Sequence, residues 1–168
     1  MELNLTDILK NDGSEKCFSE RLSLEPVKYM GLGVRFDEGV LTDGCIRNVS
    51  GVLELDMKVS CKIFTQCARC LEGVERELCV DVRETLLQEG EEALDNDSDG
   101  DVIVFSGYSL PLDEIVLNAI LVSMDVRYLC SEDCKGLCPV CGKNLNVEAC
   151  DCKSDVIDPR FEALSKLL

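Results

Sequence analysis

Cysteine is the residue type in this chain whose number and spacing point most directly to chemistry. The 168 residues include twelve cysteines and no histidine. Reduced thiols with Cys-x-x-Cys spacing are typical of a closed zinc site, in which four thiolates hold the ion tetrahedrally at about 2.3 Å. The same arrangement also holds iron, so we predict a metal site with zinc as the first choice and iron as the alternative. Six cysteines fall within 23 residues, at Cys130, Cys134, Cys138, Cys141, Cys150 and Cys152.

The segment from Cys138 to Gly142 is the most specific part of this run. Its sequence is Cys-Pro-Val-Cys-Gly, and Pro139 sets the turn between the two cysteines. Gly142 tolerates the positive φ that directs backbone N–H groups toward the sulfurs. Cys138 and Cys141 are therefore the first pair of ligands that we predict.

One tetrahedral ion needs four sulfurs, and the run offers six. Cys150 and Cys152 are the second pair that we predict, because the intervening loop is long enough to fold back. Cys134 competes with that pair, and Cys130 ranks last. We expect about one zinc per chain, with the folding of residues 130–168 dependent on it.

A separate pair, Cys67-x-x-Cys70, has three interpretations: half of a metal site, a redox pair, or two thiols in a hairpin. A redox pair usually lies at the start of a helix, whose dipole lowers the pKa of the first thiol, and a hairpin lacks this feature. Eight cysteines allow two four-ligand sites, or one site that combines Cys67 and Cys70 with a C-terminal pair. The spacing leaves these alternatives open.

Disulfides are the rival interpretation of so many cysteines. The opening Met1-Glu2-Leu3-Asn4 lacks the basic region of a signal peptide, which argues against secretion. The longest apolar stretch, Ile115 to Met124, is far too short to cross a bilayer. We therefore expect a cytoplasmic protein with reduced thiols and no membrane partner.

Charge and composition exclude several classes of function. The net charge of −16 repels nucleic acid at long range, so we expect no DNA partner, and a direct RNA binder would normally be basic. Without histidine the chain has no Ser–His or Cys–His dyad, and it has no glycine-rich phosphate loop. We predict that it is not an enzyme.

The hydrophobic pattern predicts an α+β protein. Apolar residues alternate with polar ones over 53–63 and again over 78–83, which predicts two strands, with residues 67–73 as the tip of an antiparallel hairpin. Shorter strands are expected at 18–24 and 33–36. Together they indicate an N-terminal antiparallel sheet or partly closed β-barrel from about residue 15 to residue 86.

Beyond the sheet, the sequence predicts an acidic mobile loop at about 87–101, a strand over 102–105 and one packed helix near Ile115–Met124. The loop contains the first half of a calcium-binding EF-hand pattern but has Ser106 where the pattern needs glutamate, so a solvated loop is preferred. Asp158 caps a short C-terminal helix in this interpretation. We expect two parts, a β-rich domain at 1–128 and a metal-binding module at 129–168.

Several motifs, in order over nearly the whole chain, resemble the YceD-like family, in the form that has a C-terminal cysteine cluster. The resemblance implies a role in accumulation of large-subunit ribosomal RNA, through its synthesis, processing or stability, and implies no reaction. One departure is Asp125, where the family often has proline. The motifs are Cys67-x-Arg69-Cys70-Leu71, Cys134-Lys135-Gly136-Leu137-Cys138-Pro139-x-Cys141-Gly142-x-Asn144-Leu145-Asn146, Cys150-x-Cys152 and Ile157-Asp158-Pro159-Arg160.

Two functions are compatible with these observations. The first is a non-catalytic factor for assembly of the large ribosomal subunit, whose acidic surface engages a basic ribosomal protein and acts on RNA or its assembly precursor indirectly. The second is direct RNA binding by a zinc protein through a local basic patch. A thiol-dependent enzyme is a third and weaker alternative. The basic patch would consist of Arg69, Lys135, Lys143 and Arg160.

Overall fold

The computed structural model describes residues 1–37, 39–90 and 102–152. Within these ranges the protein is α+β and mostly sheet, with nine strands and two helices. The elements are β1 Glu2–Asn4, α1 Thr6–Lys10, β2 Glu15–Leu22, β3 Val27–Tyr29, β4 Leu32–Phe36, β5 Val40–Val49, β6 Val52–Gln66, β7 Gly73–Gln88, β8 Val102–Phe105, β9 Ser109–Pro111 and α2 Leu112–Ser123.

The chain divides into two compact units. The first contains Met1–Thr65 and Glu75–Val126, and the second contains Gln66–Val74 together with the chain from Arg127 onward. The tip of the β6–β7 hairpin therefore groups with the cysteine-rich segment. The boundary expected from the sequence, at residue 128, would place that tip in the β-rich domain instead.

The first unit is built on an open, curved sheet. Neighbouring strands follow the order β2-β5-β6-β4-β3, and β7 adds to β6 while β8 adds to β7. The pairings of β2 with β5 and of β5 with β6 are antiparallel, whereas β7 and β8 run parallel. β1 and β9 form a separate two-stranded sheet. In the described part of the chain the strands do not close into a barrel, so the α+β class is confirmed in its open-sheet form.

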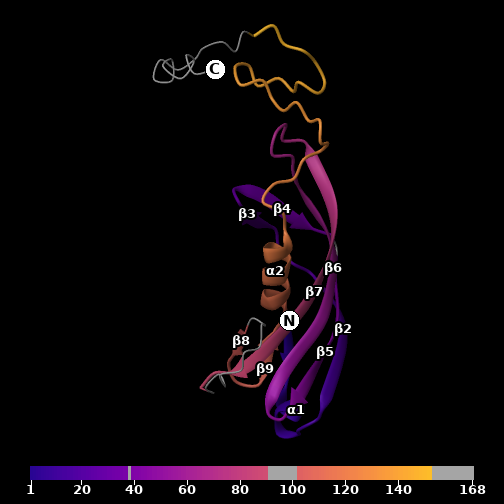
Figure 1. The fold of residues 1–168 in the computed structure, drawn as a ribbon, viewed down its shortest axis with the longest axis vertical. Helices are drawn as coiled ribbons and strands as arrows, with labels where there is room; N and C mark the ends of the chain where they lie inside the picture. The colour runs from indigo at the N-terminus through magenta and orange to yellow at the C-terminus, as the bar shows by residue number, and fades with distance from the viewer. Residues whose placement is uncertain (38, 91–101, 153–168) are drawn as a thin grey trace, which may run out of the picture. The chain divides into compact units, whose positions relative to one another are not determined.

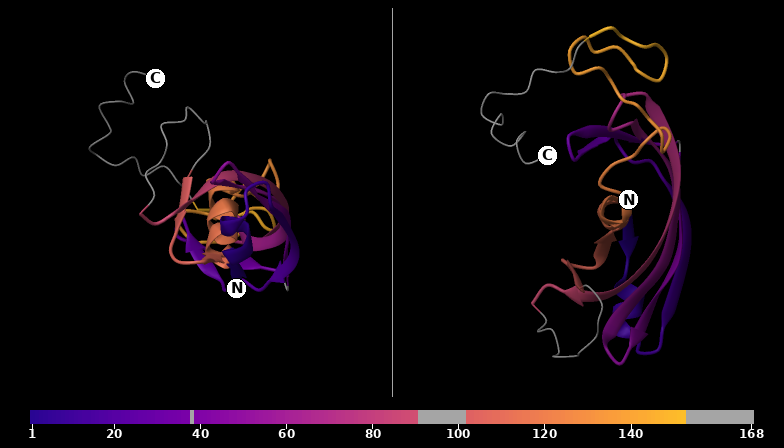
Figure 2. Two further views of the ribbon diagram at one scale, coloured as in Figure 1. Left: turned by 90° about the horizontal axis from the view of Figure 1, so that it is seen from below. Right: turned by 45° about the horizontal axis from the view of Figure 1, so that its top comes forward.

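The long strands follow the alternation expected from the sequence. In β6 the apolar residues at 53, 55, 57, 59, 61 and 63 are buried, and the polar residues between them are exposed or half-buried. This confirms the predicted strand, and β7 and β8 confirm the predictions for residues 78–83 and 102–105. The long strands β5, β6 and β7 curve around α2 in each of the views in Figures 1 and 2.

Helix α2 confirms the packed helix predicted from hydrophobic spacing. It begins after Pro111, and its buried side chains include Leu112, Ile115, Val116 and Ile120. These residues recur at helical spacing, so one stripe of the helix contributes to the core. The part of the acidic loop at 91–101, the EF-hand half-pattern within it and the predicted C-terminal helix lie outside the described residues.

Strand β5 was not predicted, because two of its core-facing residues are polar. Thr42 and Asn48 are buried at 0% and 4% exposure. The Thr42 hydroxyl donates to the Glu20 carbonyl (3.2 Å), and the Asn48 amide donates to the Ile8 carbonyl (2.8 Å). Thr42 and Asn48 thus each have a hydrogen-bond partner, which removes most of the cost of burying their side chains.

Candidate metal centres

Eight of the cysteines gather into two groups of four in the second unit. Within each group the four sulfurs lie within 4.8 Å of one another. We call the first group cluster I and the second cluster II. Cluster I contains Cys67, Cys70, Cys130 and Cys134, and cluster II contains Cys138, Cys141, Cys150 and Cys152.

The sulfur separations in cluster I match those of a tetrahedral metal site. The Cys67 and Cys134 sulfurs are 3.7 Å apart, and the Cys70 and Cys130 sulfurs are 3.5 Å apart. Four Zn–S bonds of about 2.3 Å at tetrahedral angles place the sulfurs about 3.8 Å apart. Cluster I is therefore close to the spacing that a four-coordinate ion requires, and its thiol donors suit zinc or iron.

The hairpin tip in cluster I is a tight turn whose backbone N–H groups point toward the Cys67 sulfur and carbonyl. The Arg69 N–H points at the Cys67 sulfur (3.4 Å), and the Leu71 N–H donates to the Cys67 carbonyl (3.0 Å). Leu71 has a φ of 63°, in the left-handed region that favours glycine. The tip therefore turns sharply enough to direct Cys67 and Cys70 to the same side.

The same local structure recurs in cluster II. The Val140 N–H points at the Cys138 sulfur (3.4 Å), and the Gly142 N–H donates to the Cys138 carbonyl (2.9 Å). Gly142 has a φ of 74°, as the sequence predicted for this position. The two Cys-x-x-Cys turns thus share two hydrogen bonds and a positive φ at the following residue, although only one of them contains proline and glycine.

Side chains around cluster I hold Cys134 in place. The Asn146 amide nitrogen lies 3.4 Å from the Cys134 sulfur, and the Asn146 amide oxygen accepts from the Lys135 N–H (2.8 Å). The Arg69 guanidinium donates to the Cys134 carbonyl (2.8 Å). Groups that hydrogen-bond to metal ligands fix the orientation of those ligands, and this is the role that these contacts suit.

The backbone also ties the hairpin tip to the cysteine-rich segment. The Ala68 N–H donates to the Tyr128 carbonyl (2.8 Å), and the Leu137 N–H donates to the Arg69 carbonyl (3.2 Å). Gly136 has a φ of 76°, and a Cβ at this position would lie 3.2 Å from the Arg69 carbonyl oxygen. Glycine at 136 therefore allows both the turn and the close approach of the two segments.

The thiols of each cluster oppose one another's ionisation in the absence of a cation. Burial works against ionisation of Cys67, but backbone N–H groups of Cys70, Cys130 and Arg69 outweigh it and lower the pKa of Cys67 to about 6. Interaction with Cys134 raises the pKa of Cys130 to about 12. One thiolate is thus stabilised while its neighbour is held protonated, and a bound divalent cation would allow both to ionise.

Cluster II shows the same division between its thiols. Backbone N–H groups of Cys141 and Val140 lower the pKa of Cys138 to about 6. Interaction with Cys141 raises the pKa of Cys152 to about 12. The clusters differ in exposure, since Cys67, Cys70 and Cys134 are buried in cluster I, whereas Cys138 is the buried member of cluster II.

The structure groups the four preferred cysteines together and places the competing Cys134 in the other cluster. Cys138, Cys141, Cys150 and Cys152 lie together, as expected for the preferred two pairs. Cys134, expected to compete for that site, lies with Cys67, Cys70 and Cys130 instead. The grouping of Cys134 depends on the contact between the hairpin tip and the segment that contains Cys130 and Cys134, about 60 residues away. Proximity in the sequence therefore does not decide it.

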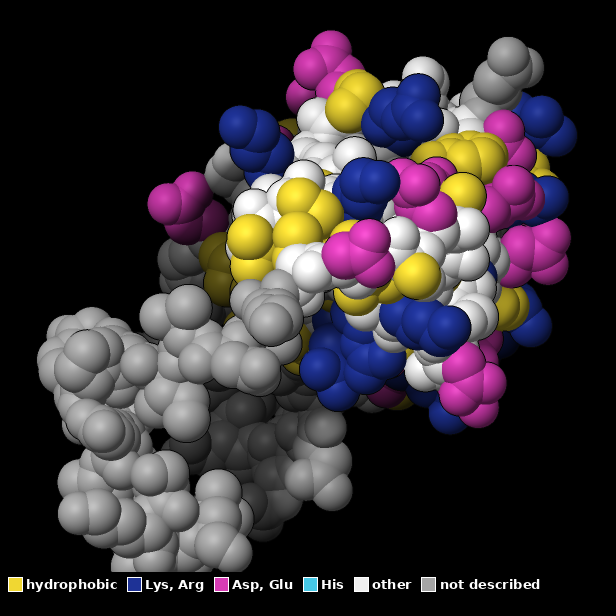
Figure 3. Space-filling model, turned by 90° about the horizontal axis from the view of Figure 1, so that it is seen from above, with side chains coloured by type: hydrophobic (Ala, Val, Ile, Leu, Met, Phe, Trp, Pro, Cys, Tyr) yellow, Lys and Arg dark blue, Asp and Glu magenta, His cyan; other side chains and the backbone are white. Residues whose placement is uncertain are grey.

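The basic residues proposed as a patch are partly engaged within the protein. Arg69 donates to the Cys134 carbonyl, and Lys143 forms an ion pair with Glu148 (3.3 Å). Lys135 is exposed, and Arg160 lies outside the described residues. On the face drawn in Figure 3, Lys and Arg side chains are interspersed with Asp and Glu side chains and do not form one basic stripe.

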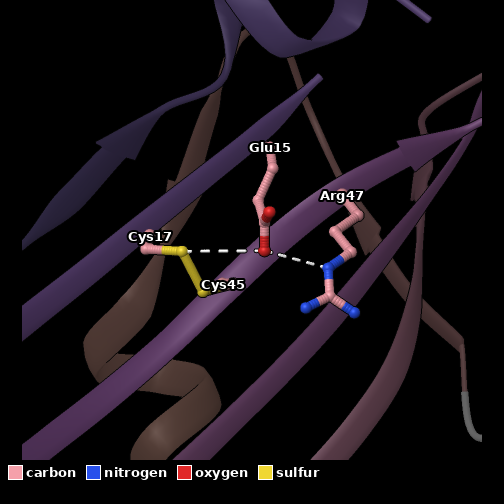
Figure 4. A network of polar contacts seen from close by, with 4 residues as sticks. All are labelled: Glu15, Cys17, Cys45 and Arg47. Atoms are coloured by element: carbon pink, nitrogen blue, oxygen red, sulfur yellow. Dashed lines mark hydrogen bonds and ion pairs between the residues drawn. A yellow bond between two sulfur atoms is a disulfide. The ribbon is translucent and has the colours of Figure 1, made fainter. Parts of the chain in front are cut away.

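A disulfide between Cys17 and Cys45 differs from the expectation that the thiols are reduced. The two residues are direct cross-strand partners on β2 and β5, with Cα atoms 4.0 Å apart. The Glu15 carboxylate lies 3.7 Å from the Cys17 sulfur and accepts from Arg47 (2.9 Å), as Figure 4 shows. Their isolated positions in the sequence gave no signal of this pairing, which results from strand register.

The comparisons with known proteins place this chain in a family. A family model described as "Large ribosomal RNA subunit accumulation protein YceD" matches residues 55–168. The chain belongs to the YceD family. The matched region contains all eight cysteines of the two clusters, so the family resemblance inferred from the motifs is confirmed. The description of the family names a role in ribosomal RNA accumulation and no reaction.

Individual relatives of this YceD-family chain are similar over most of its length. It is 26% identical over 152 residues to "Uncharacterized protein YlbN" of Bacillus subtilis (strain 168), which covers 90% of this chain and 87% of that protein. It is 28% identical over 140 residues to uncharacterized proteins of Mycobacterium bovis and Mycobacterium tuberculosis, covering 80% of this chain. The chain spans 66% of the mycobacterial proteins, just under two thirds of their length. No solved structure matches the chain.

The described part of the chain contains no helix that could cross a membrane. Neither helix there has the length and apolar character to span a bilayer.

Proposed function

We propose that this YceD-family protein is a non-catalytic factor that supports synthesis, processing or stability of large-subunit ribosomal RNA during ribosome assembly in the cytoplasm. The observation that supports this most directly is the family match over residues 55–168. That region includes the hairpin, α2 and both cysteine clusters. The role described for the family is therefore associated with the same segment that contains the candidate metal centres.

We further propose that clusters I and II each hold one zinc ion, so that the chain carries two. The support is the set of four thiols in each cluster, the 3.5–3.7 Å sulfur separations in cluster I and the matching turns at Cys67 and Cys138. This raises the expected content from about one zinc to two, and iron remains the alternative metal. The metal-binding module then consists of the hairpin tip together with residues from about 129 onward, and the β-rich domain consists of the remainder.

In this proposal the metals are structural. All four positions in each site are filled by protein sulfurs, whereas a catalytic zinc keeps one position open for water or substrate. Metal binding would hold together segments that contain little regular secondary structure and few buried apolar residues. Small modules of this kind depend on the metal for folding.

The partner we favour is a basic ribosomal protein, through which the chain would act on RNA indirectly. The net charge of −16 would attract such a protein and repel bare RNA. Two of the four patch residues, Arg69 and Lys143, already bond to groups within the module. Direct RNA binding through Lys135 and its neighbours is the second candidate.

The experiment that separates these candidates is crosslinking of the tagged protein in growing cells, followed by separate recovery of RNA and protein. We expect crosslinks to a basic large-subunit protein, with RNA recovered only through that protein. Direct crosslinks to large-subunit RNA that disappear in Lys135→Glu and persist in a matched Lys28→Glu control would favour direct binding. Recovery of neither large-subunit RNA nor large-subunit protein would contradict the proposed function.

A thiol-dependent enzyme is the remaining alternative, and it has a direct test. The double variant Cys67→Ser, Cys70→Ser would be expressed in cells that lack the native protein, and the amounts of large-subunit and small-subunit RNA would be compared. Full accumulation of large-subunit RNA would exclude thiol chemistry at this pair. It would also show that cluster I is dispensable for the role.

A further inference from the structure

Strand β2 is an open edge of the sheet in the first unit. Its one strand neighbour in the described part of the chain is β5, which pairs with all eight residues from Glu15 to Leu22. β2 lies at the margin of the sheet in Figure 1, and it is longer than the edge strands β3 and β8. An edge of this length presents unpaired backbone N–H and C=O groups to which another strand can add.

The register with β5 determines which backbone groups of β2 point to the open side. One step beyond the strand, the Asn48 N–H donates to the Ser14 carbonyl (2.9 Å). Because successive residues of a strand direct their backbone groups to opposite edges, the even-numbered residues of β2 bond to β5. Cys17 and Cys45 are then a closely spaced pair without backbone bonds, which agrees with their Cα separation of 4.0 Å. The residues whose backbone groups point to the open edge are therefore Glu15, Cys17, Ser19 and Arg21.

The sequence of β2 is complementary to itself in one antiparallel register, with a two-fold axis at Phe18. A register must pair odd-numbered residues with odd-numbered ones to bring the outward backbone groups of two copies opposite one another. With Phe18 opposite its own copy, Glu15 of one strand faces Arg21 of the other. Lys16 then faces Glu20. By symmetry each of these pairs occurs twice, so every charged side chain of β2 faces its opposite.

Neighbouring registers lack this match. An axis at Cys17 or at Ser19 places each charged residue of β2 opposite an uncharged one. Charge therefore selects a single register, and opposite charges across a strand pair stabilise it. β2 contains two acidic and two basic residues, so the strand itself is neutral although the whole chain has a net charge of −16.

The side chains of the inner charged pair are free to meet. Glu20 is half-buried and forms no ion pair within the described residues. Lys16 donates to the Asn4 carbonyl (2.7 Å), which leaves further N–H donors on its ammonium group. Glu15 of the outer pair already binds Arg47 through Oε1, so we expect the outer pair to contribute less than the inner one.

Phe18, at the proposed axis, lacks cover from its neighbouring strand. It is half-buried, and its partner on β5 is Gly44, which has no side chain to pack on the ring. A Cβ at Gly44 would lie 2.4 Å from the Met57 Cβ, so the packing beneath this position requires glycine. A second Phe18 at a closely spaced pair would cover the ring from the open side.

We propose that two copies of the chain associate through β2, as an antiparallel strand pair centred on Phe18 that joins their sheets. Backbone hydrogen bonds form across the axis, Lys16 pairs with Glu20, and the two aromatic rings pack together. The contact is one strand wide, so we expect a dissociation constant of about 1–100 μM. The inference goes beyond the proposed function and does not rest on it, since β2 lies outside the family-matched residues 55–168.

The first test is sedimentation of the full-length protein from about 1 to about 500 μM. Salt at 0.15 M reduces the Debye length to about 8 Å and screens the repulsion between two acidic chains. We expect conversion from monomer to dimer over this range, with no intermolecular disulfide on a non-reducing gel. A chain that stays monomeric throughout would overturn the proposal, including the case in which the edge serves a strand of another protein.

Charge reversal tests the register. Lys16→Glu and Glu20→Lys each place like charges opposite one another twice in the symmetric pair, so each should weaken the dimer roughly tenfold or more. An equimolar mixture of the two variants should restore association, because each new charge then faces its opposite. Lys28→Glu on β3 changes the net charge as Lys16→Glu does and should leave the dimer intact.

A second pair of variants tests the backbone contact. Ser19→Pro removes an N–H that points to the open edge, where an edge strand tolerates proline, and should weaken the dimer roughly tenfold. Ser19→Ala is the matched control, because it removes the same hydroxyl and keeps the N–H. The urea midpoint of each variant shows that the fold is retained.

The variants give two results that would overturn the proposal. A dimer that persists in both charge variants would lie on another surface of the chain. Equal dimerisation of Ser19→Pro and Ser19→Ala would show that the β2 backbone does not pair. Loss of the dimer in each charge variant, with recovery in their mixture, would confirm the β2 pair in the proposed register.

Discussion

Replacing one cysteine in each cluster should remove one metal ion and loosen one defined part of the second unit. The two variants are Cys130→Ser and Cys150→Ser, with Cys79→Ser as a control at an exposed cysteine outside both clusters. Cys130 is exposed, so serine leaves no buried cavity there. Any loss of structure in Cys130→Ser therefore reports loss of the metal site.

The size of the effect follows from the length of chain that each cluster closes. Cluster I joins residues 60 positions apart in sequence, as in the pair Cys70 and Cys130. In the chain-entropy description, a cross-link that closes about 60 residues raises the free energy of unfolding by about 4 kcal/mol. A cross-link that closes about 14 residues, as in cluster II, raises it by about 3 kcal/mol. Loss of cluster I should therefore be slightly more costly and should separate more distant segments.

Hydrogen exchange can assign each loss to its segment. The Ala68 N–H donates to the Tyr128 carbonyl across the two segments joined by cluster I, whereas the Gly142 N–H donates to the Cys138 carbonyl within cluster II. In Cys130→Ser the Ala68 amide should exchange about a thousandfold faster, since about 1.4 kcal/mol corresponds to a factor of ten. In Cys150→Ser the Gly142 amide should lose its protection, while the Ala68 amide changes little.

Metal content of the same samples completes the test. We expect native mass spectrometry to show one zinc in each variant and two in the Cys79→Ser control. Loss of both ions from each single variant would refute the division into two independent sites. Retention of both ions in Cys130→Ser, or unchanged Ala68 exchange in that variant, would refute the structural role of cluster I.

Three further outcomes follow from local geometry and ionisation. Gly44→Ala should lower the free energy of unfolding by roughly 1–3 kcal/mol in a urea titration, because its Cβ would lie 2.4 Å from the Met57 Cβ. Leu71→Gly should strengthen the free energy of zinc binding at cluster I by roughly 1 kcal/mol, because glycine adopts the φ of 63° without strain. A chelator should therefore remove zinc less readily from this variant, and faster release would contradict this. In metal-free protein the pKa values of Cys67 and Cys138 are lowered from 9.0 to about 6. Ionisation of these two thiols therefore adds to the free energy of unfolding, fully above about pH 9, and this contribution is lost as pH falls through 6. Thiolate absorbance at 240 nm should show two groups titrating near pH 6, and their absence would show that the turns do not form without metal.

Much of the sheet could be predicted from the sequence, because apolar and polar residues alternate along β6 and over residues 78–83 of β7. Polar residues at core-facing positions concealed β5, since Thr42 and Asn48 interrupt its hydrophobic pattern. The short elements β1, β9 and α1 were also not predicted. Three-residue strands such as β1 are defined by tertiary pairing, here with β9 across more than a hundred residues, and contain too few residues to show a period.

The candidate site was predicted in its residue types and only partly in its grouping. The Cys138–Gly142 turn could be identified because proline and glycine mark it. The equivalent turn after Cys67 contains neither, and Leu71 adopts the positive φ instead. The sequence placed Cys134 as a competitor for the Cys138 site, whereas a long-range contact brings Cys134 to the hairpin tip. Such a contact leaves no local periodicity in the sequence.

The central claim is that eight cysteines form two four-thiolate metal sites in one chain. The most direct measurement is native mass spectrometry of the wild-type protein purified without oxygen or chelator. Our account predicts a mass increase of two zinc ions per chain, or of two iron ions if iron is the native metal, with all eight cluster thiols protected from alkylation. A chain that carries one metal or none, with the cysteines of either cluster freely alkylated in the folded protein, would contradict it.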